Sequence, residues 1–326
     1  MDAIQITHIG HSQTCDLQKP MPKGDEVLIR VGTAGLCHTD IDILKGNYAG
    51  EYPVVPGHEF SGQVIATGEN VTSIKNGDRV AIDPLLPCQT CEQCQKGNVN
   101  LCEHFKAYGL TSPGGFAEYV AINESNCHPI GDMPYEVASL AEPFSCVFHS
   151  VDRLQLLAGD SAIVFGAGPM GLMMTLALKH RGVGHLVMVD PNTSRLENAL
   201  TMGADEAIAA PDDRQFDLVI DCSGAPQVCE HLTDLAKNGG KVLFFGVCDP
   251  KVTVAVSPYD IFRKELTLLG SHSLRGNLAD SLSFLDKNRE SALKLVTHRI
   301  SLKEMQDLLT TPAHDGRMKT QVVFDE

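Results

Sequence analysis

The sequence of 326 residues lacks any apolar run of the roughly 20 residues that a membrane-spanning helix requires. It has no cluster of Lys or Arg and a formal net charge of −15, which argues against binding to nucleic acid or to an anionic membrane. Residues 1–8 lack the basic and apolar regions of a secretion signal. These absences predict a cytoplasmic protein whose partners are a small molecule and other copies of the same chain.

The sequence also has no internal repeat and no low-complexity linker. An apolar content of 43% is that of a globular protein. At roughly 150 residues per domain, the length predicts two domains.

The chain has eleven cysteines, and in a reducing compartment these are expected to be metal ligands and buried thiols rather than disulfides. Four of them follow the pattern C-x2-C-x2-C-x7-C, namely Cys88, Cys91, Cys94 and Cys102. Thiolates at this spacing can converge on a tetrahedral zinc ion at about 2.3 Å. Residues 86–104 therefore form a predicted zinc lobe. Because all four coordination positions are filled, its role is structural.

The front of the chain has short β-type segments separated by turn residues, at 26–34, 60–68, 79–82 and 115–122. This pattern favours a partly closed β-barrel over about the first 120 residues. The cysteine lobe is an excursion from that barrel.

After Pro143 strands and helices alternate. The expected strands are 162–165, 185–190, 216–221, 241–246 and 266–269, and the expected helices are 172–180, 194–203 and 227–237. Alternation of this kind predicts a parallel, doubly wound sheet. The tail from Gly276 is expected to be mostly helical and to end in a strand at 318–324. We infer an α/β plus β fold, with a β-rich domain of residues 1–148 and 275–326 and an inserted α/β domain of residues 149–274.

A glycine-rich turn joins the first α/β strand to its helix, with the sequence Gly166-Ala167-Gly168-Pro169-Met170-Gly171. In this strand–turn–helix context, G-x-G-x-x-G is the fingerprint of dinucleotide binding. The first glycine allows the turn, the second lets backbone approach a pyrophosphate at the helix N-terminus, and the third allows close helix–strand packing. Pro169 and Met170 belong to the same predicted cofactor contact.

Asp190 ends the next strand, nineteen residues after Gly171. A carboxylate there accepts hydrogen bonds from ribose hydroxyls and repels a 2′-phosphate, which predicts NAD as cofactor. Arg195, five residues further on, leaves NADP as a minor alternative.

A second set of metal ligands lies in the front domain. Cys37, the His58-Glu59 pair and Glu142 each offer a zinc ligand, and a catalytic zinc takes three protein ligands with one position left open. Each residue alone also fits a plainer interpretation, as a buried thiol, a hydrogen-bonded histidine or a solvated carboxylate.

Together these segments resemble the zinc-containing medium-chain dehydrogenase/reductase family, and its sorbitol and polyol dehydrogenase branch more than the ethanol dehydrogenases. The resemblance covers essentially the whole chain and rests on Gly35-Leu-Cys37-His38-Thr39-Asp40, Gly57-His58-Glu59, the four-cysteine lobe, Glu142-Pro143 and the glycine fingerprint with Asp190. It implies a GroES-like barrel as catalytic domain and an inserted Rossmann domain, with substrate and nicotinamide meeting between them.

The resemblance also implies roles for single residues. Cys37 and His58 match two ligands of a catalytic zinc, and the third is Glu59 or Glu142. Thr39 matches the hydroxyl that relays the substrate proton. His38 matches a position that often contacts the pyrophosphate, with a solvated loop histidine as the alternative.

Further implications concern the metal content, the substrate and the assembly. The chain is expected to bind two zinc ions and NAD, to oxidise a sugar alcohol by hydride transfer, and to form a homodimer or homotetramer. Tyr48 and Arg275 are candidates for a polar substrate pocket, and Cys146 is expected to be a packing residue. Threonine or a vicinal diol is the alternative substrate, and a non-catalytic zinc protein that senses NAD is the alternative from another class.

Overall fold

The computed structural model describes residues 1–311 and 316–324. The chain divides into two compact units, Met1–Ser145 with Arg275–Glu326, and Cys146–Leu274. No helix within the described residues is both long enough and apolar enough to span a bilayer.

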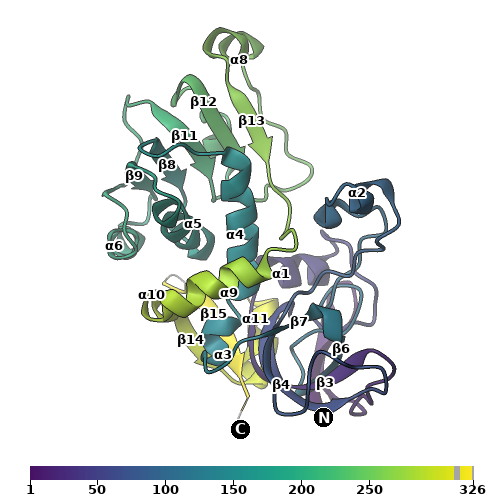
Figure 1. Cartoon of the computed structure of the whole chain (residues 1–326). Coiled ribbons are helices and arrows are strands. Elements are labelled where there is room, and N and C mark those ends of the chain that lie inside the picture. The colour runs from purple at the N-terminus through teal and green to yellow at the C-terminus, as the bar shows by residue number, and fades with distance from the viewer. Residues whose placement is uncertain (312–315, 325–326) are drawn as a thin grey trace. The chain divides into compact units, whose positions relative to one another are not determined.

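The first unit is built on a seven-stranded sheet in the order β14-β15-β3-β4-β5-β7, with β6 also paired to β3 (Figure 1). Its strands are β3 (Glu26–Gly35), β4 (Glu59–Thr67), β5 (Arg79–Ile82), β6 (Tyr119–Asn123), β7 (Cys127–Pro129), β14 (Val296–Ile300) and β15 (Lys319–Val323), and a separate hairpin consists of β1 (Asp2–His8) and β2 (His11–Asp16). The C-terminal strand β15 pairs antiparallel with the end of β3, at Gln321 and Gly35. The chain thus returns to its front domain after the α/β unit.

The helices of this unit lie between and after these strands. They are α1 (His38–Lys45), α2 (Glu92–Gln95), α3 (Tyr135–Ala138), α4 (Ala141–Leu154), α9 (Leu278–Lys287), α10 (Arg289–Leu295) and α11 (Leu302–Thr310), with 3₁₀ turns η1 (Val99–Leu101) and η2 (Glu124–Asn126). Helix α4 begins in the first unit and ends in the second. Helix α1 ends at Gly46, which has a φ of 76° and donates its N–H to Asp42 and Ile43.

The second unit has a six-stranded parallel sheet in the order β10-β9-β8-β11-β12-β13. Its elements are β8 (Ser161–Phe165), α5 (Pro169–His180), β9 (His185–Val189), α6 (Thr193–Thr201), β10 (Glu206–Ile208), β11 (Phe216–Asp221), α7 (Pro226–Cys229), β12 (Ala236–Phe244), α8 (Pro258–Lys264) and β13 (Thr267–Gly270). The order reverses between β8 and β11, as in a doubly wound fold. The predicted parallel sheet is confirmed.

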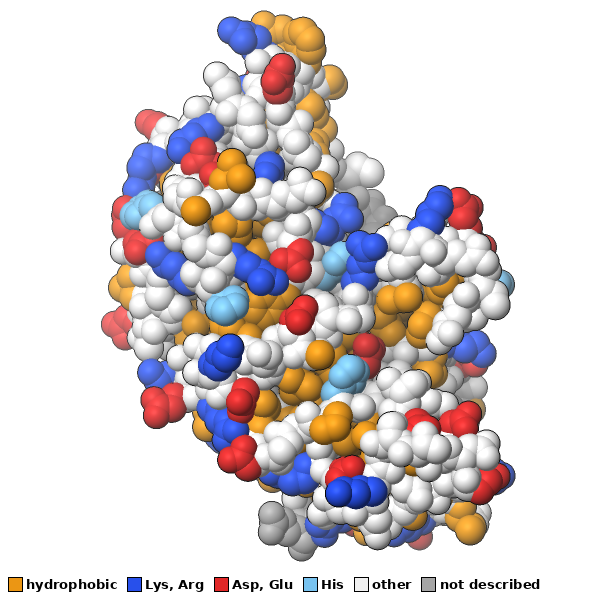
Figure 2. All heavy atoms as spheres, in the orientation of Figure 1, with side chains coloured by type: hydrophobic (Ala, Val, Ile, Leu, Met, Phe, Trp, Pro, Cys, Tyr) orange, Lys and Arg blue, Asp and Glu red, His pale blue; other side chains and the backbone are white. Residues whose placement is uncertain are grey.

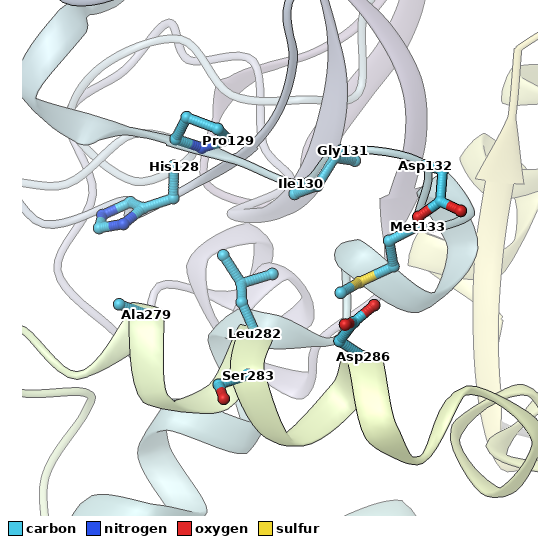
Figure 3. Close-up of a pocket in the computed structure, with 10 residues that line it drawn as sticks. All are labelled: His128, Pro129, Ile130, Gly131, Asp132, Met133, Ala279, Leu282, Ser283 and Asp286. Carbon is cyan, nitrogen blue, oxygen red and sulfur yellow. The ribbon is translucent and has the colours of Figure 1, made fainter.

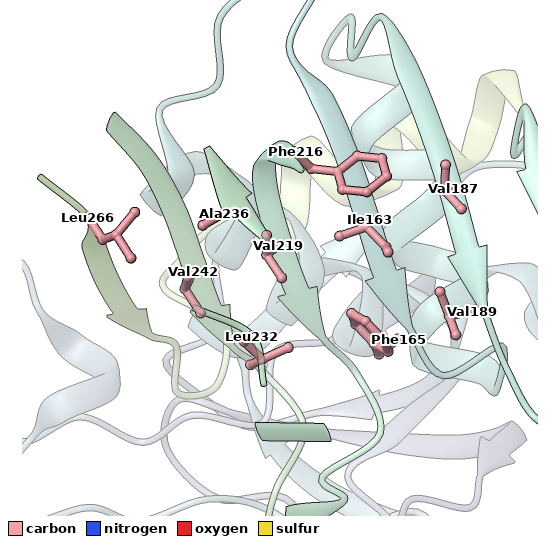
Figure 4. Close-up of a cluster of buried hydrophobic side chains, with 10 residues drawn as sticks. All are labelled: Ile163, Phe165, Val187, Val189, Phe216, Val219, Leu232, Ala236, Val242 and Leu266. Atoms are coloured by element: carbon pink, nitrogen blue, oxygen red, sulfur yellow. The ribbon is translucent and has the colours of Figure 1, made fainter. Parts of the chain in front are cut away.

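Apolar side chains from neighbouring strands form the core of this sheet, as Figure 4 shows. Strands buried on both faces have continuous β-branched and aromatic runs, as in the Ile163 to Phe165 segment of β8. The cluster consists of Ile163, Phe165, Val187, Val189, Phe216, Val219, Leu232, Ala236, Val242 and Leu266.

The strands predicted from the sequence are present, with bounds that differ by a few residues. The helix predicted over 227–237 is wrong. Only Pro226–Cys229 is helical, residues 230–235 form turns, and Ala236 starts β12 by pairing with Phe216. Leu232 and Ala236 are fully buried in the sheet core, so tertiary packing outweighs the helix-forming composition of the segment.

Candidate functional site

The four cysteines of the zinc lobe come together in space. The sulfur atoms of Cys88, Cys91, Cys94 and Cys102 all lie within 4.8 Å of one another. Hydrogen bonds from the hydroxyl and backbone of Thr90 and from the backbone of Cys91 lower the pKa of Cys88 to about 5. Burial raises the pKa of Cys94 to about 12, so the four thiols do not share one shift, and it is the convergence of four sulfurs that fits a tetrahedral zinc ion.

Arg275 contacts this lobe. Its Nε donates to the backbone carbonyl of Gly97 at 2.9 Å, and its side chain is exposed. This bond joins the lobe to the start of the C-terminal segment, and the assignment of Arg275 to a substrate pocket stays a prediction. Tyr48 is half-buried just after α1, and its assignment to a substrate pocket stays a prediction.

A second cluster of metal-binding groups joins Cys37, His58 and Glu59, whose ligand atoms lie within 4.8 Å of one another. Cys37 precedes α1, and His58 and Glu59 lie at the start of β4. Glu59 pairs with Gly35 at the end of β3, so the adjoining ends of two neighbouring strands bring these three residues together.

Asp40 fixes the two loops of this cluster. Its fully buried carboxylate accepts from the Cys37 N–H at 2.9 Å and from the Gly57 N–H at 3.0 Å. Its Oδ1 also lies 3.5 Å from Nδ1 of His58. Nδ1 has no hydrogen-bond partner among the described residues, so at 3.5 Å the Asp40 carboxylate acts on the imidazole through its charge. Burial lowers the pKa of His58, but the charges of Cys37 and Asp40 raise it well above its usual value.

Glu59 is 1% exposed and forms an ion pair with Lys319 of β15, at 2.5 Å between Oε1 and Nζ. Its second oxygen, Oε2, is buried with no hydrogen-bond partner among the described residues. A Cβ atom at Gly35 would come within 2.4 Å of Oε2, so the glycine leaves the room this carboxylate needs. An unpartnered buried carboxylate oxygen beside a thiol and an imidazole fits a cation.

Lys319 contacts this cluster, although no sequence pattern pointed to it. It is 4% exposed; burial lowers its pKa, but the charges of Glu59, Cys37 and Glu142 outweigh this effect and raise it. A lysine beside the apolar residues of the predicted C-terminal strand could have indicated a buried ion pair, because lysine is almost never fully buried unless it is paired.

Glu142 lies in the first turn of α4 and is buried, with 7% exposure. It belongs to the surroundings of Lys319 but not to the group whose ligand atoms lie within 4.8 Å. Glu59 is thus the acid that the structure groups with Cys37 and His58. Cys146, one turn further along α4, is half-buried.

Thr39 and His38 begin α1 beside the cluster. Thr39 is half-buried, and its Oγ1 lies 3.5 Å from the sulfur of Cys37. His38 has a side chain that is 75% exposed, with Nε2 3.8 Å from Asp42. Of these two residues, Thr39 is the one close to the metal ligands.

The glycine turn in the second unit has the expected tight geometry. Gly166 has a φ of 99°, and a Cβ at Gly171 would lie 1.7 Å from the Gly166 carbonyl oxygen. A Cβ at Gly168 would meet nothing within 4 Å. Gly168 caps α5, and Pro169 and Met170 are its half-buried first residues. Open space at the N-terminus of a twelve-residue helix fits a phosphate group.

Asp190 connects this turn to the next one. It is 4% exposed, and its carboxylate accepts from the N–H of Ala167 at 2.7 Å and from that of Asn192 at 2.8 Å. Arg195 lies 4.0 Å from the same carboxylate. A carboxylate and a guanidinium group therefore lie side by side at the end of β9.

The first unit also contains a pocket of about 450 Å³ between one face of α9 and the stretch formed by β7 and the segment that follows it, shown in Figure 3. The lining residues are His128, Pro129, Ile130, Gly131, Asp132, Met133, Ala279, Leu282, Ser283 and Asp286. Arg289 bridges the two acids, Asp132 and Asp286, which leaves little free charge for a ligand. The lining includes none of the residues predicted above to bind zinc or to contact the substrate.

Comparisons with known proteins identify the family of the chain. Residues 23–132 match the alcohol dehydrogenase GroES-like domain and residues 169–287 match the zinc-binding dehydrogenase domain. D-altritol 5-dehydrogenase of Agrobacterium fabrum is 43% identical over 98% of this chain and 99% of its own.

Two solved structures are also similar. A zinc-binding dehydrogenase of Sinorhizobium meliloti 1021 bound to NADP has a TM-score of 0.95 and 30% identity, over 99% of this chain and 98% of its own. A short chain alcohol dehydrogenase of Escherichia coli CFT073 complexed with NADH has a TM-score of 0.92 and 28% identity, over 99% of each chain. With both domain matches in order along one chain, the protein belongs to the zinc-binding medium-chain dehydrogenases, which combine a GroES-like domain with a Rossmann-like domain.

Proposed function

We propose that the protein oxidises a polyol, or another secondary alcohol, with NAD as the hydride acceptor. The observation that carries the proposal is the Cys37, His58 and Glu59 cluster, with its unpartnered carboxylate oxygen. A closed four-thiol site has no place for a substrate, whereas three protein ligands leave one position open.

The residues around this cluster define the chemistry. A zinc ion held by Cys37, His58 and Glu59 would supply the Lewis acidity that lowers the pKa of a substrate hydroxyl. Thr39, 3.5 Å from the Cys37 sulfur, would receive the hydroxyl proton and pass it toward solvent, where His38 is exposed. Asp40 would hold the His58 ring in orientation through Nδ1.

Two observations support a polyol rather than a simple alcohol. By the family resemblance, Glu142 stands where ethanol dehydrogenases have a second cysteine, and a carboxylate near the metal cluster suits a substrate with several hydroxyls. The 43% identical relative is a D-altritol 5-dehydrogenase, a polyol enzyme. The test is an initial-rate screen of sugar alcohols, 2,3-butanediol, threonine and ethanol with NAD. We expect the highest kcat/KM for a sugar alcohol, and a clear preference for threonine would refute this assignment.

Metal analysis tests the catalytic site itself. We expect two zinc ions per chain, falling to one in Cys37→Ser with loss of activity. A single zinc in the unmodified protein would refute the proposed catalytic zinc, and the hypothesis of a non-catalytic protein that senses NAD would then be favoured.

The choice of NAD rests on Asp190, whose carboxylate suits ribose hydroxyls and repels a 2′-phosphate. Arg195, at 4.0 Å, is the argument for NADP. We expect Arg195→Ala to keep the use of NAD and Asp190→Ala to raise the use of NADP. Equal kcat/KM for the two nucleotides in the unmodified protein would contradict the NAD preference.

We also propose that the protein assembles with copies of itself through the β13 edge. β13 ends the six-stranded sheet, and apolar side chains are exposed on and before the neighbouring helix α8, as the orange patch at the top of Figure 2 shows. Tyr259 is 68% and Phe262 77% exposed. An unpaired strand edge beside an apolar patch suits self-pairing by a second copy. Light scattering should show that the parent is a dimer or tetramer. Phe262→Glu should dissociate it, whereas Leu157→Glu, at another exposed apolar site, should leave it assembled. A monomeric parent would refute the proposal.

A further inference from the structure

Two cysteines outside both metal clusters lie side by side in the second unit. Cys229 ends α7 and is buried, and Cys248 follows β12 and is half-buried. Their sulfur atoms are 3.7 Å apart and both thiols are free. A disulfide needs an S–S distance of about 2.05 Å, so the two sulfurs would have to approach by about 1.7 Å.

Asp221, at the end of β11, lies beside the pair. The Cys229 thiol donates to its Oδ2 at 3.6 Å. The other carboxylate oxygen, Oδ1, accepts from the Ser223 N–H at 2.8 Å and from the Ser223 hydroxyl at 2.6 Å. Asp221 therefore connects the buried thiol to the loop that follows β11.

The loops that follow β11 and β12 are packed against each other. The Gly246 N–H donates to the Asp221 carbonyl at 2.8 Å, and a Cβ at Gly224 would lie 2.4 Å from the Val247 carbonyl oxygen. Val247 itself is 83% exposed, so the segment carrying Cys248 is open to solvent on its outer side. A small oxidant can reach Cys248, and the partner thiol is already adjacent.

The loop that follows β11 lies beside the glycine turn. A Cβ at Gly166 would lie 3.2 Å from the backbone of Ser223. This edge carries the carboxyl ends of the parallel strands, next to the reversal between β8 and β11, where sheets of this kind bind nucleotides. A shift in the β11 loop would therefore press on the glycine turn of the proposed nucleotide site.

We propose that Cys229 and Cys248 are a redox modification site, at which hydrogen peroxide joins them as a disulfide and so weakens nucleotide binding at the adjacent turn. The effect on nucleotide binding rests on the nucleotide site proposed above, whereas the formation of the disulfide does not depend on that site.

The reaction takes two steps and two electrons. The Cys248 sulfur attacks one peroxide oxygen, the O–O bond breaks, and Cys248 becomes a sulfenic acid with release of one water. The Cys229 sulfur then forms the S–S bond and displaces the sulfenic oxygen as a second water. Burial and the charge of Asp221 raise the pKa of Cys229 to about 12, so its proton must leave during the attack, and Asp221 Oδ2 is the adjacent acceptor. Two thiols are oxidised and one peroxide is reduced.

The experiment uses the zinc-loaded protein, treated with hydrogen peroxide or left reduced. Free thiols are then alkylated and the disulfides are mapped by mass spectrometry. We expect a Cys229–Cys248 crosslink. Calorimetry should show nucleotide binding weakened by about tenfold, in the range of coupling between neighbouring sites, and restored by a phosphine reductant.

The controls separate this pair from the zinc thiolates. Cys248→Ser and, independently, Cys229→Ala should abolish both the crosslink and the peroxide effect, whereas Cys15→Ser should keep both. Zinc release is followed with a chromophoric chelator, and a loss of binding that persists in Cys248→Ser belongs to the metal sites and contradicts the proposal. Absence of the crosslink, or a crosslink with unchanged binding, also overturns it. If the reduced protein binds neither NAD nor NADP, the nucleotide site itself fails.

Discussion

Replacement of Lys319 by methionine tests the electrostatics of the catalytic cluster most directly. The substitution keeps most of the side-chain length and removes the charge that is paired with Glu59. Both partners are at least 96% buried, and removing one member of such a pair leaves an uncompensated charge, at a cost of about 3–5 kcal/mol. We therefore expect the metal-free Lys319→Met protein to lose about that much free energy of unfolding.

Zinc should reverse part of this loss, because the ion becomes the counter-charge of Glu59. If binding recovers about 2 kcal/mol, the zinc affinity of the site rises about thirtyfold. Urea unfolding with and without zinc gives the first quantity, and competition with a chromophoric chelator gives the second. The variant thus binds metal more tightly while its metal-free form is less stable.

Two matched variants control for the substitution itself. Lys319→Arg keeps the charge and should stay close to the parent in both assays. Lys237→Met removes a lysine whose side chain is 44% exposed and which pairs with Asp217, and exposed pairs contribute only about 0–1 kcal/mol. A metal-free Lys319→Met protein as stable as the parent, or one that binds zinc more weakly, would refute the reasoning.

Three further changes have distinct expected outcomes. Gly171→Ala should unfold at a lower temperature because its Cβ would lie 1.7 Å from a backbone oxygen. Gly168→Ala should keep the melting temperature of the parent, and calorimetry should show that it binds the nucleotide more weakly. An equal drop in melting temperature for the two variants would contradict this. Cys91→Ser should lose one zinc per chain and melt earlier while keeping the catalytic metal, as metal analysis with calorimetry will show. Burial raises the pKa of Asp83 to about 6, so its contribution to stability is present below about pH 4 and is lost as the pH rises through 6. The free energy of unfolding in urea should therefore fall by up to about 3 kcal/mol over this range in the parent, and fall less in Asp83→Asn. The same fall in both proteins would count against this expectation.

The features that the sequence predicts well have local causes. The four-cysteine lobe, the glycine turn and the apolar strands each depend on residues close together in the chain, so spacing alone identifies them. The parallel sheet follows because alternating strands and helices of that length have few other ways to pack.

The features that the sequence misses depend on distant contacts. β10 has no buried residue and β14 has only one, so the hydrophobic pattern of each segment is too weak to predict a strand. Both become strands because they pair with β9 and β15. The 227–237 segment has helix-forming composition, yet Leu232 and Ala236 are taken into the sheet core. In each case the deciding energy comes from a partner strand and not from the segment itself.

The choice between Glu59 and Glu142 has the same origin. In the sequence, Glu59 directly follows a ligand and Glu142 stands at the matching position of the family, so the two are equal candidates. The fold separates them, because the pairing of β3 with β4 places Glu59 beside Gly35, and β15 brings Lys319 onto one of its oxygens from 260 positions away. The other oxygen has no hydrogen-bond partner among the described residues, so it is available to a cation. If Glu59 is the third ligand, as proposed, its ion pair with Lys319 would occupy one carboxylate oxygen and leave the other for the ion. Three protein ligands would then leave one position open for a substrate.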